Sequence, residues 1–239
     1  MKYPILGRER RRPIALSAVG TVLVLAFACV LFTLTVLAIQ PGLLSDTLAA
    51  FWEDKLLIPL NIFPVCVVLI VCYCLTGNAF SAAGIGGLVV NLLSYINLVK
   101  TDCRNDPFVP ADCALLREAA NAVGDYQLNL HWGTLAAIVL MSAVCFALAY
   151  WSRARKPRWY VRSIMALVVL AVFGASMVKV YPSGDIYDRR GVGTVKASKS
   201  NVPEVFRLCG FPYCFLHNYN LYPVEKPDGY QKTQVETLI

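Results

Sequence analysis

Charged residues and histidines are scarce in this chain. Of its 239 residues, 15% are charged and two are histidine, whereas 57% are apolar. Soluble domains usually carry about 25% charged residues, so this composition indicates an integral membrane protein. The nine cysteines include no CxxC pair and no histidine at zinc-binding spacing, which argues against a metal site in this chain.

A net charge of +7 could indicate binding to nucleic acid, but the distribution of the basic residues argues against it. No basic face with interleaved aromatic side chains is present, and the lysines and arginines instead flank the apolar runs. The run GVGTVK at 191–196 lacks the spacing of a phosphate-binding loop. We therefore expect membrane lipids, and no nucleic acid, as partners.

Five apolar runs are long enough to cross about 30 Å of hydrocarbon. We predict an all-α membrane protein in which residues 1–180 form the transmembrane domain and 181–239 form a juxtamembrane connector. A cleaved signal peptide is the alternative for the first run, but that run is longer than the usual apolar region of a signal peptide, and no obvious small-residue cleavage site follows it. The expected spans cover residues 14–39, 56–75, 79–99, 132–151 and 163–180.

Two basic clusters predict how these spans are oriented. One lies in residues 2–12 and the other in residues 153–162, and four spans separate them. An even number of spans puts both clusters on the same side, which the positive-inside rule makes cytoplasmic. The N-terminus should then be cytoplasmic, and residues 181–239 should lie outside the cell membrane.

The spans themselves contain few polar residues. Pro59, Asn61 and Pro64 should kink or loosen the second span, either for packing or around a cavity. Small residues from Ala82 to Gly87 predict a close helix contact in the third span. No span contains Asp, Glu or Arg, which argues against a small transporter.

A polar island at 100–126 separates the third and fourth spans. Pro107 and Pro110 favour an extended start, Asp112 offers an N-cap, and Gly124 offers a helix stop. Apolar residues at 116, 119, 120 and 123 share one helical face, so we expect an amphipathic helix on the outer membrane surface.

The outer segments hold the candidate functional residues. An arginine near the interface suits a lipid phosphate, and carboxylates suit a hydroxyl or a cation. The alternatives are simple capping by Asp112 and a solvated helix face at residues 117 and 118. Cys103 with Cys113, and Cys209 with Cys214, are either disulfides or thiols. The aromatic segment 205–222 should lie in the interface, where it anchors the tail or shelters a lipid. The candidates for lipid binding or domain docking are Arg104, Asp106, Asp112 and Glu118.

Two motifs together resemble a known family. RNDPFVPAD at 104–112, followed by Glu118 and Ala119, is similar to the loop after the third span of lipoteichoic acid synthase-like phosphoglycerol transferases, members of the alkaline phosphatase/sulfatase superfamily. CGFPYCFLHN at 209–218, with KPDGY at 226–230, looks like the connector from their fifth span to the outer enzyme domain.

The resemblance implies an outer-face transferase that moves glycerol phosphate from phosphatidylglycerol, with a threonine nucleophile and Mn²⁺ in a sulfatase-like domain. Residue 239 lies just before the position where that domain would start, so no nucleophile or metal ligand maps onto this sequence. We expect the membrane-embedded N-terminal part of such a transferase, inactive alone, with the catalytic domain absent. The alternative is a stand-alone partner or regulator that docks on a complete transferase in trans.

Overall fold

The computed structural model describes residues 14–40, 42, 44–113, 130–154, 157–183 and 202–219. The described chain is helical apart from two three-residue strands. Five helices are long and apolar enough to cross a membrane, which confirms the predicted class. They are α1 (Ala18–Ala38), α3 (Leu57–Thr76), α4 (Ala79–Arg104), α6 (Trp132–Trp151) and α7 (Trp159–Lys179).

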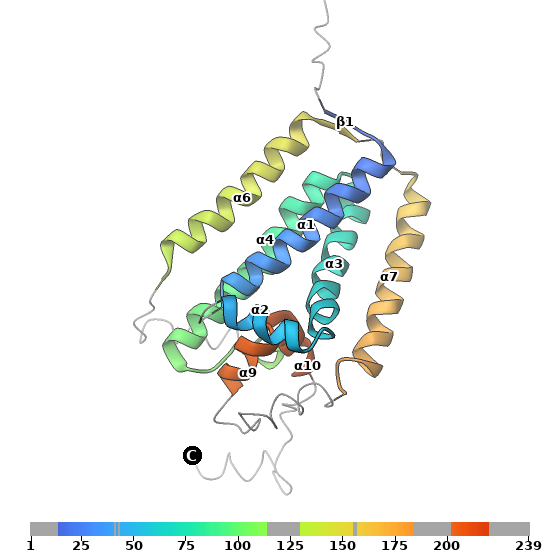
Figure 1. The fold of residues 1–239 in the computed structure, drawn as a ribbon. Coiled ribbons are helices and arrows are strands. Elements are labelled where there is room, and N and C mark those ends of the chain that lie inside the picture. The colour runs from blue at the N-terminus through green and yellow to red at the C-terminus, as the bar shows by residue number, and fades with distance from the viewer. Residues whose placement is uncertain are drawn as a thin grey trace, which may run out of the picture.

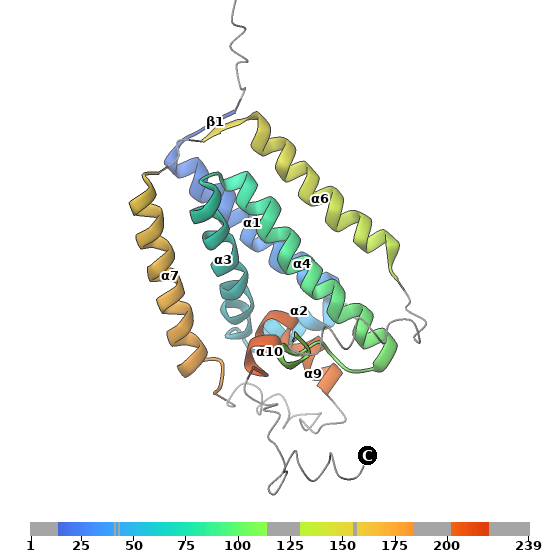
Figure 2. The ribbon, with the colours of Figure 1, turned by 180° about the vertical axis from the view of Figure 1, so that it is seen from behind.

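Three of these helices form the centre of the bundle. α1, α3 and α4 pack together, while α6 lies along α4 and α7 lies along α3 (Figures 1 and 2). α6 buries only Ile138 and Ser142, and α7 buries no residue. Their exposed side chains are mostly apolar, as expected for helices that face lipid.

Small residues permit the close contact between the central helices. A Cβ at Gly87 of α4 would overlap the ring of Phe32 in α1. A Cβ at Gly86 would come within 2.8 Å of Leu69 in α3. The close contact predicted from the small residues of the third span is therefore present.

Several helix boundaries differ from the prediction. Residues Ile14–Leu16, expected in the first span, form strand β1, which pairs in parallel with β2 (Ser152–Ala154). Ser17 then caps α1, since its hydroxyl accepts the Gly20 N–H at 3.1 Å. α4 continues past residue 99 to Arg104 because no Pro or Gly interrupts it, and α7 begins at Trp159 instead of 163.

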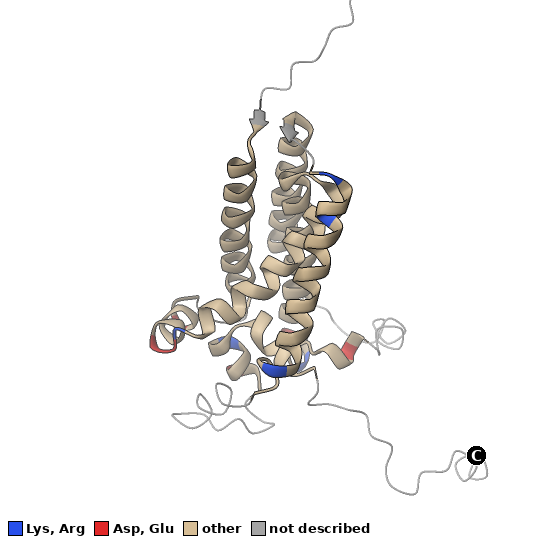
Figure 3. Cartoon of the chain, turned by 90° about the vertical axis from the view of Figure 1, so that its right-hand side faces the viewer, with Lys and Arg blue, Asp and Glu red and all other residues tan. Residues whose placement is uncertain are grey.

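The bundle has two distinct ends. The strand end carries β1, β2 and the turn between α3 and α4, where the Asn78 amide donates to the Ser152 hydroxyl at 3.0 Å. The tail end carries α2 (Leu44–Glu53), the 3₁₀ helix η1 (Pro110–Cys113), α9 (Val202–Cys209) and α10 (Phe211–His217). Lys and Arg lie near both ends and not in the middle (Figure 3).

Two connectors at the tail end differ in how far they match expectation. The connector between the first two spans, for which the sequence pattern predicts no helix, contains α2, which buries Thr47, Ala50 and Phe51. The amphipathic helix expected after Asp112 lies in residues outside the described part of the chain, which reaches only η1.

Candidate functional site

The C-terminal tail packs into the tail end of the bundle. Residues 202–219, called here the tail hairpin, comprise α9 and α10 joined at Gly210. α10 packs on α3, and α9 packs on α2. The hairpin contributes to the main apolar core through Val205, Phe206, Phe211, Tyr213 and Cys214.

Asn61 of α3 fixes the corner of the hairpin. This residue is fully buried, and its amide nitrogen donates to the Cys209 carbonyl at 2.8 Å. Its amide oxygen accepts the Tyr213 N–H, one of the amides at the start of α10 that has no helical partner, at 3.2 Å. Gly210 has a φ of +87°, and any Cβ there would overlap the Asn61 amide. The packing of the hairpin turn against α3 therefore depends on both Gly210 and Asn61.

Pro64 of α3 provides a second attachment point. A proline has no N–H, so it cannot bond to the carbonyl of Leu60 four residues earlier. The hydroxyl of Tyr181, which follows α7, donates to that carbonyl at 2.9 Å. Tyr181 is buried, which raises the pKa of its hydroxyl and keeps the donor protonated. Its own carbonyl lies 2.6 Å from Nδ1 of His217 in α10, so the exit of the fifth span is tied to both helices.

Arg207 joins the hairpin to α2. Its guanidinium pairs with Glu204 of α9 at 2.5 Å and with Asp46 of α2. These carboxylates raise the pKa of Arg207 above its ordinary value, so its charge is permanent. The Thr47 hydroxyl also donates to the Arg207 carbonyl at 2.8 Å, which fixes α9 in register with α2.

Lys100 organises the start of the polar island. Its ammonium group lies 2.7 Å from carboxylate oxygens of both Asp106 and Asp112 and donates to the Pro107 carbonyl at 2.9 Å. Asp112 also accepts the Val109 N–H at 2.8 Å. One largely buried cation thus closes residues 105–113 into a compact island loop.

The island loop contacts the other side of α10. The Asn97 side chain of α4 accepts the Phe108 N–H at 2.8 Å. The ring of Phe108 stacks on Phe215 of α10, with centroids 5.7 Å apart. α10 is therefore held between α3 on one side and the island loop on the other.

The structure brings together only part of the predicted set. Asp106 and Asp112 meet through Lys100, and Arg104 lies exposed in the last turn of α4. Asp112 accepts the N–H of the residue three positions before it, and the helix that it is expected to cap lies outside the described residues. Glu118 lies outside the described residues.

The four cysteines at the tail end differ in exposure. Cys209 and Cys214 are buried in the tail hairpin, Cys103 is half-buried and Cys113 is exposed. All four are thiols in this structure, and the formation of either disulfide stays a prediction. Burial and the neighbouring Cys209 raise the pKa of Cys214, so its unreactive protonated form is favoured.

Sequence reasoning missed the residues that hold the site. The sequence predicted no particular contact for Lys100 beyond its place at the start of the polar island. For Asn61 it predicted only a kinked or loosened second span. Two features of the sequence could have indicated these roles. Lys100 is followed by an acidic loop, and Asn61 is a single amide inside an apolar span, where a polar side chain requires hydrogen-bond partners. The sequence likewise did not indicate that Nε2 of His131 lies 2.6 Å from the carboxylate of Asp102 near the end of α4.

No group of three metal-ligating side chains occurs in the described residues. Mn²⁺ thus remains an expectation for a sulfatase-like domain and has no candidate site among the described side chains. Comparisons with known proteins add no assignment: no family model, curated protein or solved structure matches this chain.

Proposed function

We propose that this chain is the membrane-embedded part of a lipoteichoic acid synthase-like phosphoglycerol transferase. It anchors and orients an extracytoplasmic sulfatase-like domain, which acts in cis or in trans, and it presents phosphatidylglycerol to that domain. The observation that carries the proposal is the docked tail hairpin. Asn61, Tyr181 and Arg207 fix the last described segment against the bundle, so the chain beyond residue 219 starts from a defined point.

The arrangement of the connectors supports the orientation. α2, η1 and the tail hairpin lie at the tail end, whereas β1, β2 and the turn at 77–78 lie at the strand end. In the sequence, the basic residues at 2–12 precede β1 and those at 153–162 run from β2 into α7, so the positive-inside rule makes the strand end cytoplasmic. The tail hairpin and the island loop then lie on the outer face of the cell membrane.

The contacts of the outer residues suggest separate roles. Asp106 and Asp112 are already engaged by Lys100, so they shape the island loop against α10 and favour domain docking. Arg104 is exposed at the membrane boundary and suits a lipid phosphate. A bulky enzyme domain would thereby be oriented close to the headgroup on which it acts.

The test is reconstitution in phosphatidylglycerol vesicles with a sulfatase-like domain of the family and Mn²⁺. That domain is supplied separately or fused after residue 239, and release of diacylglycerol is measured. We expect no turnover by the chain alone and faster turnover when chain and domain are combined. Asn61→Ala should reduce the gain, whereas Gly174→Ala, at a site with nothing within 4 Å, should not. Turnover by the chain alone, or no gain over the domain alone, would refute the proposal.

A further inference from the structure

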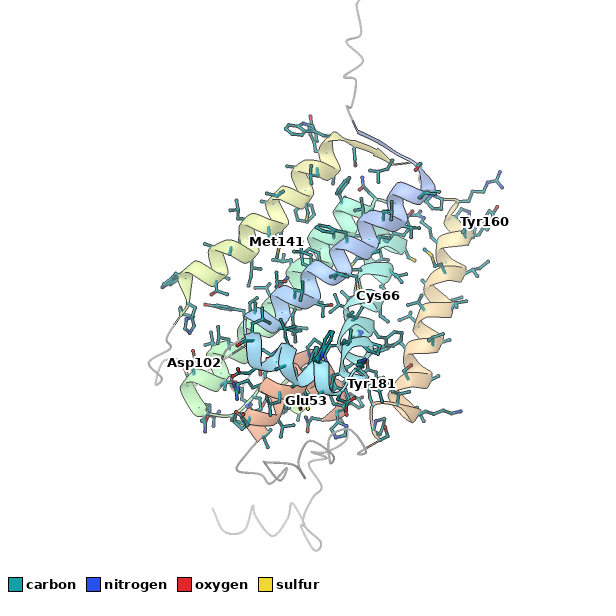
Figure 4. All side chains as sticks on the ribbon, viewed as in Figure 1. Glu53, Cys66, Asp102, Met141, Tyr160 and Tyr181 are labelled. Carbon is teal, nitrogen blue, oxygen red and sulfur yellow. The ribbon has the colours of Figure 1, made fainter. Side chains whose placement is uncertain are left out.

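Side chains of α1, α4 and α6 and of residues just beyond their ends line an open pocket of about 570 Å³ at the tail end, called here the Gln40 pocket. Figure 4 shows Asp102 near the end of α4 and Met141 on α6, and both residues line it. Asn91, on the same helix as Asp102, lies deepest, about 16 Å away at the usual rise of an α-helix. The pocket therefore extends from the membrane boundary well into the spans.

Two amides in this pocket lack the partners that burial requires. Gln40 is 6% exposed, and neither its amide nitrogen nor its amide oxygen meets a hydrogen-bond partner within the described chain. Asn91 is fully buried, and its amide oxygen likewise has no partner there. Burying such groups is costly unless something bonds to them, so both amides point to a ligand in the pocket.

The lining also indicates the chemistry of that ligand. Among the described residues, no lysine or arginine lines the pocket, which disfavours a phosphate inside it. At the mouth, His131 already occupies the Asp102 carboxylate, which disfavours an ammonium group. Amides and the hydroxyls of Thr35 and Thr134 both donate and accept, and the ligand groups that do the same are hydroxyls.

We propose that the Gln40 pocket binds the hydroxyl-bearing headgroup of a membrane lipid, such as a glycerol or sugar headgroup. Leu98, Ile138 and Met141 provide an apolar wall beside the polar groups, as an amphiphile requires and a free polyol does not. The assignment deepens the proposed function, on which it rests only for the outward orientation of the tail end. The experiment for the pocket does not use a transferase domain.

The experiment is native mass spectrometry of the full chain taken from vesicles of equal parts phosphatidylglycerol and phosphatidylcholine with matched acyl chains. We expect about tenfold preferential retention of phosphatidylglycerol, the ratio that roughly one additional hydrogen bond gives. Gln40→Leu should abolish this preference. Ser142→Ala, which alters a buried polar residue of α6 outside the pocket, should keep it.

Three results would overturn the assignment. Equal retention of both lipids by the wild-type chain, or an unchanged preference in Gln40→Leu, would contradict the pocket's role. Displacement of the retained lipid by free glycerol would contradict a lipid as the source of the hydroxyls.

A folding defect can be recognised separately, because replacing an unpartnered buried amide should not lower thermal stability in lipid-free detergent. Lipid preference without any gain in transferase turnover would refute the proposed function and leave the pocket assignment standing. A turnover gain without lipid preference would refute the pocket assignment and leave the proposed function standing.

Discussion

Asn61→Ala should release the tail hairpin from the bundle without unfolding the spans. The substitution removes two buried hydrogen bonds between α3 and the hairpin, to the Cys209 carbonyl and from the Tyr213 N–H. Buried bonds of this kind contribute about 1–1.5 kcal/mol each, so docking should weaken by about 2–3 kcal/mol. At about 1.4 kcal/mol per tenfold change, the undocked population should rise roughly 30- to 150-fold.

Hydrogen–deuterium exchange of the protein in lipid nanodiscs measures that population directly. The amides of α10 should exchange faster by the same factor, while those of α1 and α4 should be unchanged. Asn91→Ala is a matched control, because both asparagines are fully buried and donate to the carbonyl four residues earlier at 2.8 Å. The Asn91 side chain donates within α4, to the Gly87 carbonyl, so its loss should leave α10 protected.

Two outcomes would refute this reasoning. Exchange of α10 within twofold of the wild-type rate in Asn61→Ala would mean that apolar packing alone holds the hairpin. Equal acceleration by Asn91→Ala would mean that any buried asparagine stabilises the bundle generally.

Three further predictions concern other contacts. Lys100→Met should weaken the island loop by about 1 kcal/mol, since one of its two carboxylate partners is largely exposed, and exchange at residues 106–113 reports this. Gly87→Ala should destabilise the bundle by about 1–3 kcal/mol through overlap with α1, whereas Gly174→Ala should be neutral or stabilising in thermal unfolding in detergent. Maleimide should label exposed Cys113 but not Cys214. The pKa of Cys214 is raised in the docked state, so docking should be constant at pH values below the ordinary pKa of a thiol and should weaken as the pH rises above it. Increased labelling of Cys214 would show this weakening.

The spans could be predicted because membrane thickness sets their length. About twenty apolar residues in a row have few alternative structures, so the five expected runs became α1, α3, α4, α6 and α7. The predicted helix boundaries are wrong where contacts between residues distant in the sequence determine the structure. Ile14–Leu16 is apolar enough to extend the first span, but it pairs with residues 152–154, which no local pattern reveals.

The tail end was harder to predict for the same reason. The Cys209 partner of Asn61 lies 148 residues away in the sequence, and the Phe215 partner of Phe108 lies 107 residues away. Local patterns could show only that an amide inside an apolar span needs partners and that 205–222 is aromatic-rich. They could not show that these two features satisfy each other.

The contact between Tyr181 and the Leu60 carbonyl affects the timing of biosynthesis. Leu60 is made 121 residues before its hydroxyl donor, an interval of roughly 6–24 seconds at ribosomal speeds of about 5–20 residues per second. During that interval the nascent second span has a backbone acceptor awaiting a donor that arrives only after the fifth span. A ribosome that stalls before codon 181 would leave this acceptor unsatisfied, and the released product would be a substrate for cellular proteolysis.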